Sequence, residues 1–570
     1  MLYLIFLFNA LRFLGLEISP PGFYADESYG ATQVICIRET GADFFRHFLP
    51  LFAISGPGEP IYTPTYLYGQ ILWTSIFGYS IAAFRAFPAF ITTLTILFLY
   101  LFVKNKINYR TALYVAFVAS IMPWAFQFSR IAWDPPLAPL FLIMTLWIST
   151  WHKRWWLTGI PLALSIYSYP PLRIIAPLIW LLIPGISSRR KIVVLFIAGF
   201  FCIPLLLQFQ DENFANRSNM LALWSPVFYN PYRHLDLSEL IPIFLRNFGA
   251  HFSFRFLFIS GENNLRHSIQ SFGMLSWLDF LALISILGLI GARVLRKIPS
   301  IFEDTQYQIL GIALIGVIVS TIPAALTNEG SPHALRAISV WPFYALMTGI
   351  ILSRINDLLK SKKIALSFIA LGTIFFGLYQ YFYFYKYPYF SQEAFEAGFS
   401  NNILYPKLLS GESSCDEVRA TVKIMDRNTR LGETIFFAKD SKGPITSYLN
   451  KHWHDREAWG IWSDGKNADL LIPLPNGNPR KIQIQFNAFL TPLHPYQDLE
   501  ILINGQLLQK IRIDQASGNT ISLNLPDDIN PDKLLNIEFR TPNAVSPTQA
   551  GVSSRDQRIL GFGLVSVQFD

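Results

Sequence analysis

Two adjacent acids stand near the start of the chain, Asp26 and Glu27, and a carboxylate can accept a proton in catalysis. They follow an apolar run over residues 2–16, which at about 1.5 Å per residue is close to the shortest helix that crosses a bilayer. The pair is therefore expected at the membrane surface, a position that suits chemistry on a lipid headgroup. The alternative is structural: Asp26 would be the N-cap of a helix that runs through Val34, and Glu27 would favour its first turn.

Apolar residues dominate the composition. Of the 570 residues, 52% are hydrophobic and only 15% are charged, a balance that predicts a membrane protein and excludes an ordinary soluble one. The net charge is +8, but many lysines and arginines fall in short loops between apolar runs. The charge is therefore expected to reflect membrane topology rather than binding to nucleic acid.

About eleven apolar runs predict as many membrane-spanning helices. The basic loops between them share one side if the first span exits outward, as the positive-inside rule requires. This arrangement puts residues 17–80, 209–275, 327–337 and everything after 386 on the outer face. The first run lacks basic residues before it and a cleavage site after it, which predicts an uncleaved span. The expected spans are 2–16, 81–103, 111–127, 135–151, 155–168, 172–188, 191–208, 277–293, 308–326, 338–353 and 364–386.

The first outer loop, residues 17–80, is long and aromatic, and its segments 28–37 and 65–77 are expected to be helices in the interface plane. Arg85 lies just beyond it, inside the second span. There it is either an anchor that snorkels to the interface or the partner of an anion.

Further basic residues are expected on the outer face, against the inside bias, and a lipid phosphate explains them better than topology does. Arg130 and Asp134 stand four residues apart, which allows either a structural ion pair or a second carboxylate beside Asp26. The other candidates for binding a phosphate or positioning a lipid are Arg266, His267, His333 and Arg336.

The composition becomes that of a soluble protein after Lys386. From Lys481 onward, apolar residues alternate at period two, which predicts antiparallel strands, and Asn504-Gly505 predicts a tight hairpin turn between two of them. We expect a jelly-roll-like β-sandwich on the outer face. The predicted division is a transmembrane domain over 1–386, a linker and start of the outer region over 387–470, and the sandwich over 471–570.

The three cysteines, Cys36, Cys202 and Cys415, show no paired spacing, so neither a zinc motif nor a disulfide framework is expected. Cys36 and Cys415 are both predicted on the outer, oxidising side, which leaves a bridge between them as the alternative.

Several short motifs follow one another through the membrane part: Phe23-Tyr24-Ala25-Asp26-Glu27, Leu49-Pro50, the Pro- and Tyr-rich turn over 60–68, Phe77-Gly78 with Arg85, Ser129-Arg130 with Asp134, residues 256–261, and Pro332 through Arg336. Their order and spacing resemble the bacterial membrane glycosyltransferases of the GT-C fold. The nearest likeness is to glycosyltransferase family 39, which is related to protein O-mannosyltransferases and to the lipid A aminoarabinose transferase. The tail resembles an outer jelly-roll domain found on some such enzymes.

The resemblance implies transfer of a sugar from a polyprenyl phosphate to an acceptor on the outer face, with inversion at the anomeric carbon. Asp26 matches the family's general base, which accepts the proton of the acceptor hydroxyl, and Glu27 matches the second acid of that pair. Arg85 matches an arginine important in the mannosyltransferases. Asp134 matches an acid of the second outer loop.

Glu59 corresponds to a metal-contacting acid of the aminoarabinose enzyme, although Glu59-Pro60 stands here in place of the Glu-Lys-Pro run of that enzyme. Arginines can stabilise a phosphate monoester without a metal. No cofactor is therefore expected, and a divalent metal is not required.

The expected partners are a polyprenyl-phosphate-linked sugar, an acceptor that is a protein, a lipid or a glycan, and membrane lipids, with no nucleic acid. The expected location is the bacterial cell membrane, crossed many times, with the C-terminal domain outside. One alternative is a transporter or flippase of a lipid-linked sugar. Transporters usually show internal repeats and charges in mid-span, whereas the ionisable residues here gather at one face. Another is a binding protein whose sandwich does the work.

Overall fold

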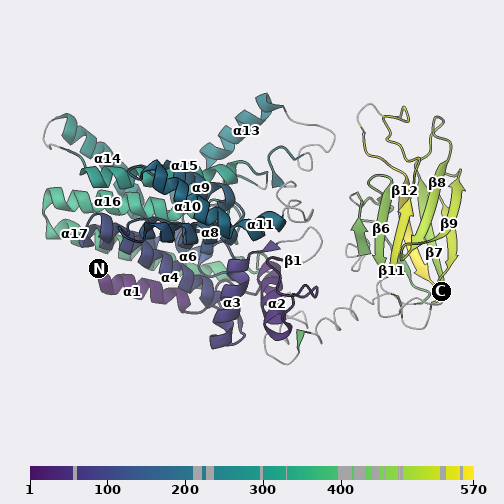
Figure 1. Ribbon diagram of the computed structural model, residues 1–570, viewed down its shortest axis with the longest axis horizontal. Helices are drawn as coiled ribbons and strands as arrows, with labels where there is room; N and C mark the ends of the chain where they lie inside the picture. The colour runs from purple at the N-terminus through teal and green to yellow at the C-terminus, as the bar shows by residue number, and fades with distance from the viewer. Residues whose placement is uncertain are drawn as a thin grey trace. The chain divides into compact units, whose positions relative to one another are not determined.

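The computed structural model divides the chain into two compact units (Figure 1). The first comprises Met1–Ser225 and Leu235–Cys415, and the second is chiefly Asp416–Asp570. The structure describes all residues except 55–60, 209–220, 226–235, 296–299, 329, 396–413, 416–430, 440, 442–447, 455, 473, 476–478, 527–534 and 553–555.

All eleven apolar runs predicted as spans form helices in the first unit. Five stretches, Ile81–Lys106, Trp277–Val294, Asp304–Ala325, Ile338–Leu359 and Lys362–Phe390, are long and apolar enough to cross a membrane. The others are shorter, so the count of eleven spans stays a prediction. The bounds are α1 (Leu2–Ala10) with η1 (Leu11–Phe13), α4 (Ile81–Lys106), α5 (Tyr109–Ile121), α6 (Pro123–Phe128), α7 (Leu137–Ile148), η2 (Trp155–Thr158), α8 (Gly159–Ser168), α9 (Leu172–Leu182), α10 (Ser188–Phe201), α11 (Ile203–Gln208), α14 (Trp277–Val294), α15 (Asp304–Ala325), η4 (Ile338–Val340), α16 (Trp341–Leu359), α17 (Lys362–Tyr381) and η5 (Phe382–Lys386).

Helix α5 packs against α1, α4 and α16. Side-chain caps fix where some of the helices begin. Ser80 Oγ accepts the Ala83 N–H at 3.0 Å before α4, and Asn108 Oδ1 accepts the Thr111 N–H at 2.8 Å before α5. These caps separate successive apolar helices of a multi-pass membrane domain.

The predicted outer loops carry their own elements. The two interfacial segments predicted in the first loop are helical, as α2 (Ala25–Thr40) and α3 (Pro64–Phe77), and between them β1 (Ala53–Ile54) pairs with β2 (Ile61–Tyr62). The elements of the later predicted outer segments are α13 (Leu237–Ala250), the π-turn η3 (Arg255–Ile259) and α18 (Tyr387–Phe390).

The second unit is a sandwich of two five-stranded antiparallel sheets, which confirms the all-β prediction. One sheet has the order β10-β7-β12-β3 with β5 also on β12, and the other has the order β4-β6-β11-β8-β9. Asn504 and Gly505 have φ of 49° and 84°, as a two-residue hairpin requires. The strands are β3 (Thr434–Phe436), β4 (Leu449–Lys451), β5 (Ile461–Trp462), β6 (Asn467–Ile472), β7 (Lys481–Ala488), β8 (Gln497–Ile503), β9 (Gln506–Ile513), β10 (Asn519–Asn524), β11 (Leu535–Arg540) and β12 (Phe562–Phe569).

The sandwich begins earlier than the period-two pattern indicated. Strands β3 to β5 and most of β6 precede residue 471. Apolar residues from both sheets form its core, among them Leu470 of β6, Ile484 of β7 and Phe539 of β11. Burial alternates strictly along β11, so every second side chain of that strand faces the other sheet.

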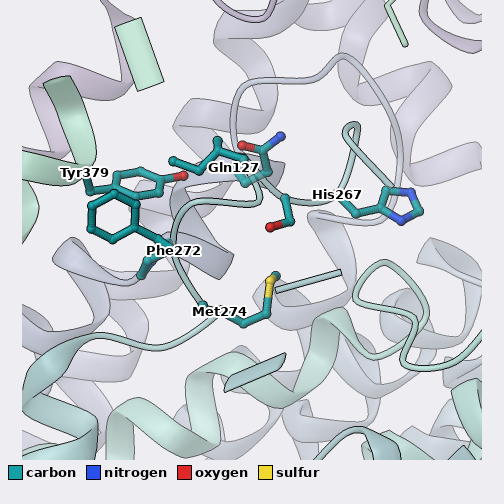
Figure 2. Close-up of a pocket in the computed structure, with 9 residues that line it drawn as sticks. Gln127, His267, Phe272, Met274 and Tyr379 are labelled. Atoms are coloured by element: carbon teal, nitrogen blue, oxygen red, sulfur yellow. The ribbon is translucent and has the colours of Figure 1, made fainter. Parts of the chain in front are cut away.

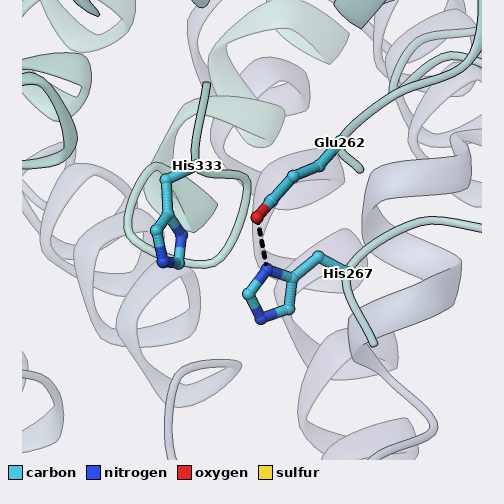
Figure 3. A group of neighbouring side chains, drawn as sticks. All are labelled: Glu262, His267 and His333. Carbon is cyan, nitrogen blue, oxygen red and sulfur yellow. Dashed lines mark hydrogen bonds and ion pairs between the residues drawn. The ribbon is translucent and has the colours of Figure 1, made fainter. Parts of the chain in front are cut away.

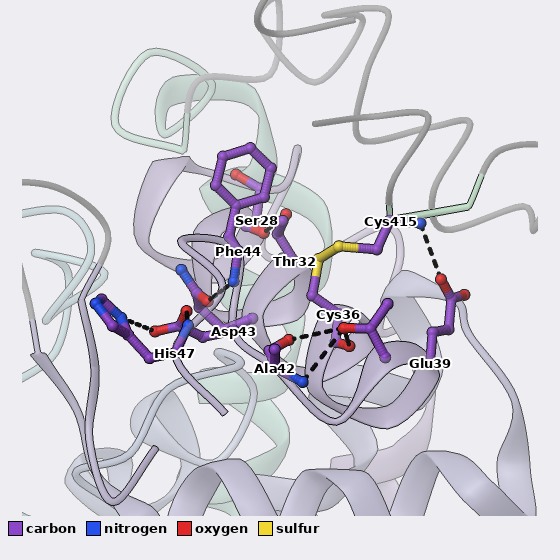
Figure 4. Close-up of a disulfide and its surroundings, with 11 residues drawn as sticks. Ser28, Thr32, Cys36, Glu39, Ala42, Asp43, Phe44, His47 and Cys415 are labelled. Atoms are coloured by element: carbon purple, nitrogen blue, oxygen red, sulfur yellow. Dashed lines mark hydrogen bonds and ion pairs between the residues drawn. A yellow bond between two sulfur atoms is a disulfide. The ribbon is translucent and has the colours of Figure 1, made fainter. Parts of the chain in front are cut away.

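A disulfide joins Cys36 in α2 to Cys415, with Cα atoms 5.1 Å apart (Figure 4). The expectation that the cysteines form no disulfide is therefore wrong, and the alternative bridge is the correct one. Spacing along the sequence could not show it, because the two residues are 379 positions apart. Cys202 is a buried free cysteine.

Candidate functional site

Asp26 and Glu27 both lie in the first turn of α2. The structural alternative is therefore right for Glu27, but Asp26 is not the N-cap. Tyr24 occupies that position, in an extended conformation and without a side-chain cap. The two acids differ in exposure, because Asp26 is half-buried and Glu27 is fully buried. Adjacent residues of a helix point in different directions, so only one of the two carboxylates is placed deep in the protein.

Glu27 and Arg85 form a buried bidentate ion pair. Arg85 Nε donates to Oε1 of Glu27 at 2.8 Å, and Nη2 donates to Oε2 at 2.7 Å. Glu27 Oε1 also accepts the N–H of Ala132 at 2.8 Å. The remaining N–H groups of Arg85 donate to the carbonyls of Leu16, Pro20 and Gly22.

These contacts change the roles expected for Glu27 and Arg85. A guanidinium has five N–H donors, and all five of Arg85 bind protein atoms. The prediction that Arg85 binds the donor phosphate is therefore not supported by this arrangement, nor is a reacting role for Glu27. Both residues instead fix the beginning of α2 against α4.

Arg130 is fully buried and binds backbone rather than a ligand. Its five N–H groups donate to the carbonyls of Leu11, Arg12, Gly15 and Ser19, at 2.7–3.4 Å. Neither the predicted phosphate contact nor the alternative ion pair with Asp134 accounts for these donors. Buried carbonyls that no helix or sheet satisfies need such partners.

Arg12 is a third buried arginine beside Arg85 and Arg130. It is fully buried and donates to Asn9 Oδ1, Ser129 Oγ and the carbonyls of Ser120 and Ala125. We call Arg12, Arg85 and Arg130 the arginine group. Together they hold the segment 11–22, which leads from α1 into the two acids of α2.

A second cluster gathers residues from two other predicted outer loops (Figure 3). His267 Nδ1 and Glu262 Oε1 are 2.8 Å apart, and the rings of His267 and His333 have centroids 5.0 Å apart. Glu262 Oε2 also accepts the N–H of Ala334, so one carboxylate joins the loop after η3 to the loop after α15. We call Glu262, His267 and His333 the histidine group.

The neighbours of the histidine group set its charge. Burial favours the neutral acid, but His267, His333 and the hydrogen bonds to Glu262 outweigh it and lower the pKa of that carboxyl. His251 accepts the backbone N–H of His333 at 3.0 Å, and burial lowers the pKa of its imidazole. Arg336 is buried, and its backbone N–H donates to His333 Nδ1 at 3.4 Å.

The histidine group could hold a metal. One ligand atom from each of Glu262, His267 and His333 lies within 4.8 Å of the others, and a carboxylate with two imidazoles is a ligand set that zinc accepts. Binding would replace the contact between Glu262 and His267. Glu262 was not among the predicted site residues, although an acid five positions before His267 is a spacing that could have indicated it.

Aromatic rings connect the histidine group to the start of α2. Trp133 lies 6.0 Å from His267 and 6.3 Å from Tyr24, measured between ring centroids. The guanidinium of Arg266 lies 4.6 Å from the centre of the Tyr24 ring. The structure thus brings Arg266 and His267 near the helix that carries Asp26.

The remaining predicted site residues, Asp134 and Glu59, belong to neither the arginine group nor the histidine group. Asp134 is half-buried and acts electrostatically on Tyr66 and Arg173. Glu59 lies outside the described residues, so its predicted metal contact stays a prediction. The Tyr62 hydroxyl donates to the backbone carbonyl of Asp26 at 2.9 Å, which ties the first turn of α2 to the end of β2.

A small cavity lies beside His267, lined also by Gln127 and Met274 (Figure 2). Its volume is about 10 Å³, far below the roughly 300–1,000 Å³ of ordinary ligand pockets. Gln127 Oε1 is buried without a hydrogen-bond partner among the described residues. The cavity therefore suits a water molecule better than a sugar.

Residues 59–207 match the model of the dolichyl-phosphate-mannose-protein mannosyltransferase family. This match confirms the resemblance to mannosyltransferase-like membrane glycosyltransferases that the motifs predicted. It begins downstream of Asp26 and Glu27, and covers Arg85, Arg130 and Asp134. No curated protein sequence matches the chain.

Solved structures show partial likeness. The apo oligosaccharyltransferase of Archaeoglobus fulgidus has a TM-score of 0.38 at 15% identity, over 68% of this chain and 55% of that one. ArnT of Cupriavidus metallidurans bound to undecaprenyl phosphate has a TM-score of 0.40 at 9% identity, and the match covers 77% of this chain and 82% of that one. The arabinosyltransferase EmbB of Mycobacterium smegmatis has a TM-score of 0.30 at 11% identity, and the match covers 99% of this chain and 64% of that one. This chain thus spans about half the length of the oligosaccharyltransferase.

Proposed function

We propose that this protein is an inverting glycosyltransferase that moves a sugar from a polyprenyl-phosphate donor to an acceptor on the outer face of the cell membrane. The observation that carries the proposal is the contrast between two adjacent acids. Glu27 is buried against Arg85, whereas Asp26 is only half-buried in the same helical turn. A base must reach the acceptor hydroxyl, and Asp26 meets that requirement.

In this reaction the Asp26 carboxylate accepts the proton of the acceptor hydroxyl while the hydroxyl oxygen attacks the anomeric carbon. The bond from that carbon to the phosphate oxygen breaks, and its electron pair leaves with the phosphate. One displacement inverts the anomeric centre. Glu27 and Arg85 act as positioning residues, because they fix the turn that carries Asp26.

The leaving phosphate needs cationic or N–H partners. Since the donors of Arg85 and Arg130 bind protein atoms, we assign this role to residues of the later predicted outer loops. The candidates are Arg266, His267, His333 and Arg336. A polyprenyl phosphate as the carrier agrees with the family description matched by residues 59–207.

The disulfide supports the outer orientation. Disulfides persist in oxidising compartments and are rare in the cytosol. The bond between Cys36 and Cys415 joins the first predicted outer loop to the chain that follows the last predicted span. Both segments therefore fit the extracytoplasmic side, as the positive-inside rule predicted.

The test is a transfer assay in detergent or lipid with a panel of radiolabelled polyprenyl-phosphate sugars, comparing the wild type with Asp26→Asn. We expect one donor to be turned over or slowly hydrolysed by the wild type. The variant should lose at least about 100-fold in rate, the low end of what a general base contributes, while still binding the donor.

Glu17→Gln is the matched control, because Glu17 is an exposed acid in the same predicted outer loop. It should keep full turnover. Equal rates for wild type and Asp26→Asn would overturn the assignment of the base. A donor that is bound and moved across liposomes, but never cleaved, would favour the flippase alternative.

A further inference from the structure

The chain that follows the last membrane helix returns to the start of α2. Residues 391–395 come directly after α18, and Phe395 is fully buried. Its ring meets the Tyr24 ring edge to face, with centroids 5.8 Å apart, and it meets the Tyr387 ring at 6.2 Å. A residue from the far end of the first unit therefore packs on the N-cap of the helix that carries Asp26.

Arg266 closes a ring of contacts around Tyr24. Its guanidinium lies over the Tyr24 ring, and its Nε donates to the carbonyl of Ala394 at 2.7 Å. The carbonyl of Arg266 accepts from Gln127 Nε2 at 3.0 Å, and the same Nε2 donates to the Tyr387 hydroxyl at 2.7 Å. Tyr24 is thus held on one side by Phe395. On another side it is held by Arg266, which binds Ala394, the residue before Phe395.

The other end of α2 is also fixed by the chain that follows the membrane part (Figure 4). Cys36 bonds to Cys415, and Glu39 Oε2 accepts the N–H of Cys415 at 2.9 Å. Cys415 is the last residue of the first unit, where the chain passes to the second. We call residues 391–395 with Cys415 the post-membrane segment.

We propose that the post-membrane segment belongs to the catalytic site of the proposed transferase: it holds α2 at both ends and so positions the Asp26 carboxylate. Its members are positioning residues, since they act through Tyr24 and Cys36. This inference rests on the proposed function for its kinetic consequence, but the hold on α2 can be measured without turnover.

The physical reason is that the position of α2 depends on its tertiary contacts. It has 16 residues, and most of the stability of a helix in a protein comes from tertiary packing and not from its intrinsic propensity. Its first turn is fixed on one side by Glu27 and Arg85, and the post-membrane segment supplies the hold on Tyr24 and on the last turns. A displacement of about 1 Å at a catalytic group can cost about 100-fold in rate.

The first experiment compares wild type, Phe395→Ala and Phe390→Ala. Phe390 is the matched control, because it packs on Tyr387 at 5.8 Å but is 43% exposed and lies in α18. Hydrogen exchange followed by mass spectrometry reports on residues 24–30. We expect about tenfold faster exchange there in Phe395→Ala and unchanged exchange in Phe390→Ala.

Turnover gives the second measurement. With the donor found for the wild type, Phe395→Ala should lower kcat about 10- to 100-fold and leave the KM for the donor unchanged. Phe395→Leu, which restores most of the buried volume, should recover kcat. A merely structural role would lower the amount of folded protein and leave the kcat of the remainder intact.

The disulfide is tested with the double variant Cys36→Ala, Cys415→Ala, against Cys202→Ala as the control for a buried cysteine. We expect faster exchange over residues 33–40 and a smaller drop in kcat than for Phe395→Ala. If exchange in α2 is unchanged in both the Phe395 and the cysteine variants, the inference is wrong. If exchange rises but the wild type transfers no sugar, the hold on α2 stands and the proposed function fails.

Discussion

The arginine group and the histidine group are both buried clusters of charged residues, but they differ in what satisfies their polar atoms. Arg85 and Arg130 give their donors to Glu27 and to backbone carbonyls of the segment 11–22. Glu262 binds His267 within the loop after η3 and accepts the N–H of Ala334 from the loop after α15. Burial of a cation is therefore not by itself a sign of a ligand site, because backbone carbonyls can take all of its donors.

The second difference is in protonation. Arginine stays charged under all ordinary conditions, whereas histidine can release its proton near neutral pH. Loss of a partner therefore leaves a permanent buried charge in the arginine group. An imidazole carries no such permanent charge, so the same loss in the histidine group should cost less.

Glu27→Gln should have the largest effect on stability. It leaves the Arg85 charge buried without its counter-ion, which costs about 3–5 kcal/mol. We expect little folded protein, measured by thermal unfolding in detergent. Glu27→Gln combined with Arg85→Met removes both charges and should recover part of the loss, and failure to recover would contradict a specific pairing.

Arg130→Lys should come next. Lysine offers three donors in place of five, so carbonyls of the segment 11–22 lose their partners at a cost of about 1–3 kcal/mol. Thermal unfolding in detergent measures this loss, and Arg110→Lys, at an exposed arginine, is the control. An equal melting temperature in both variants would show that the five contacts of Arg130 add nothing.

Glu262→Gln should cost less, about 1 kcal/mol, because it weakens the hydrogen bonds to His267 and to the Ala334 N–H without leaving a buried guanidinium unpaired. The pKa of Glu262 is lowered from its ordinary 4.5. Its contribution is therefore present above about pH 4.5 and is lost as the pH falls through the lower folded value. The gap in melting temperature between wild type and Glu262→Gln should narrow on acidification, and a constant gap would contradict this.

Tyr24→Phe should have the smallest effect. The Tyr24 hydroxyl is buried without a hydrogen-bond partner among the described residues, so its removal at neutral pH should be close to neutral for stability. Burial, followed by Asp26 and Glu27, raises the pKa of Tyr24 well above its ordinary value of 10.0. The wild type should therefore lose stability relative to Tyr24→Phe only as the pH rises above about 10, measured by unfolding at increasing pH.

Much of the fold could be predicted because it depends on local pattern. Apolar runs located all eleven helical segments, and period-two alternation located strands β7 to β12. The start of the sandwich was placed too late, because β3, β4 and β5 have only two or three residues each and show no clear period. Short strands are defined by the partners they pair with.

Hydropathy and periodicity were enough to predict a membrane protein with a C-terminal β-sandwich, and to expect Asp26 and Glu27 at the membrane surface. Contacts between distant segments fixed which acid is buried, that Arg85 and Arg130 hold backbone, and that Cys36 bonds to Cys415. The reason is physical: hydropathy and period are properties of neighbouring residues. Which donor meets which acceptor depends on contacts between segments that can lie hundreds of residues apart, such as the 379 that separate the two cysteines.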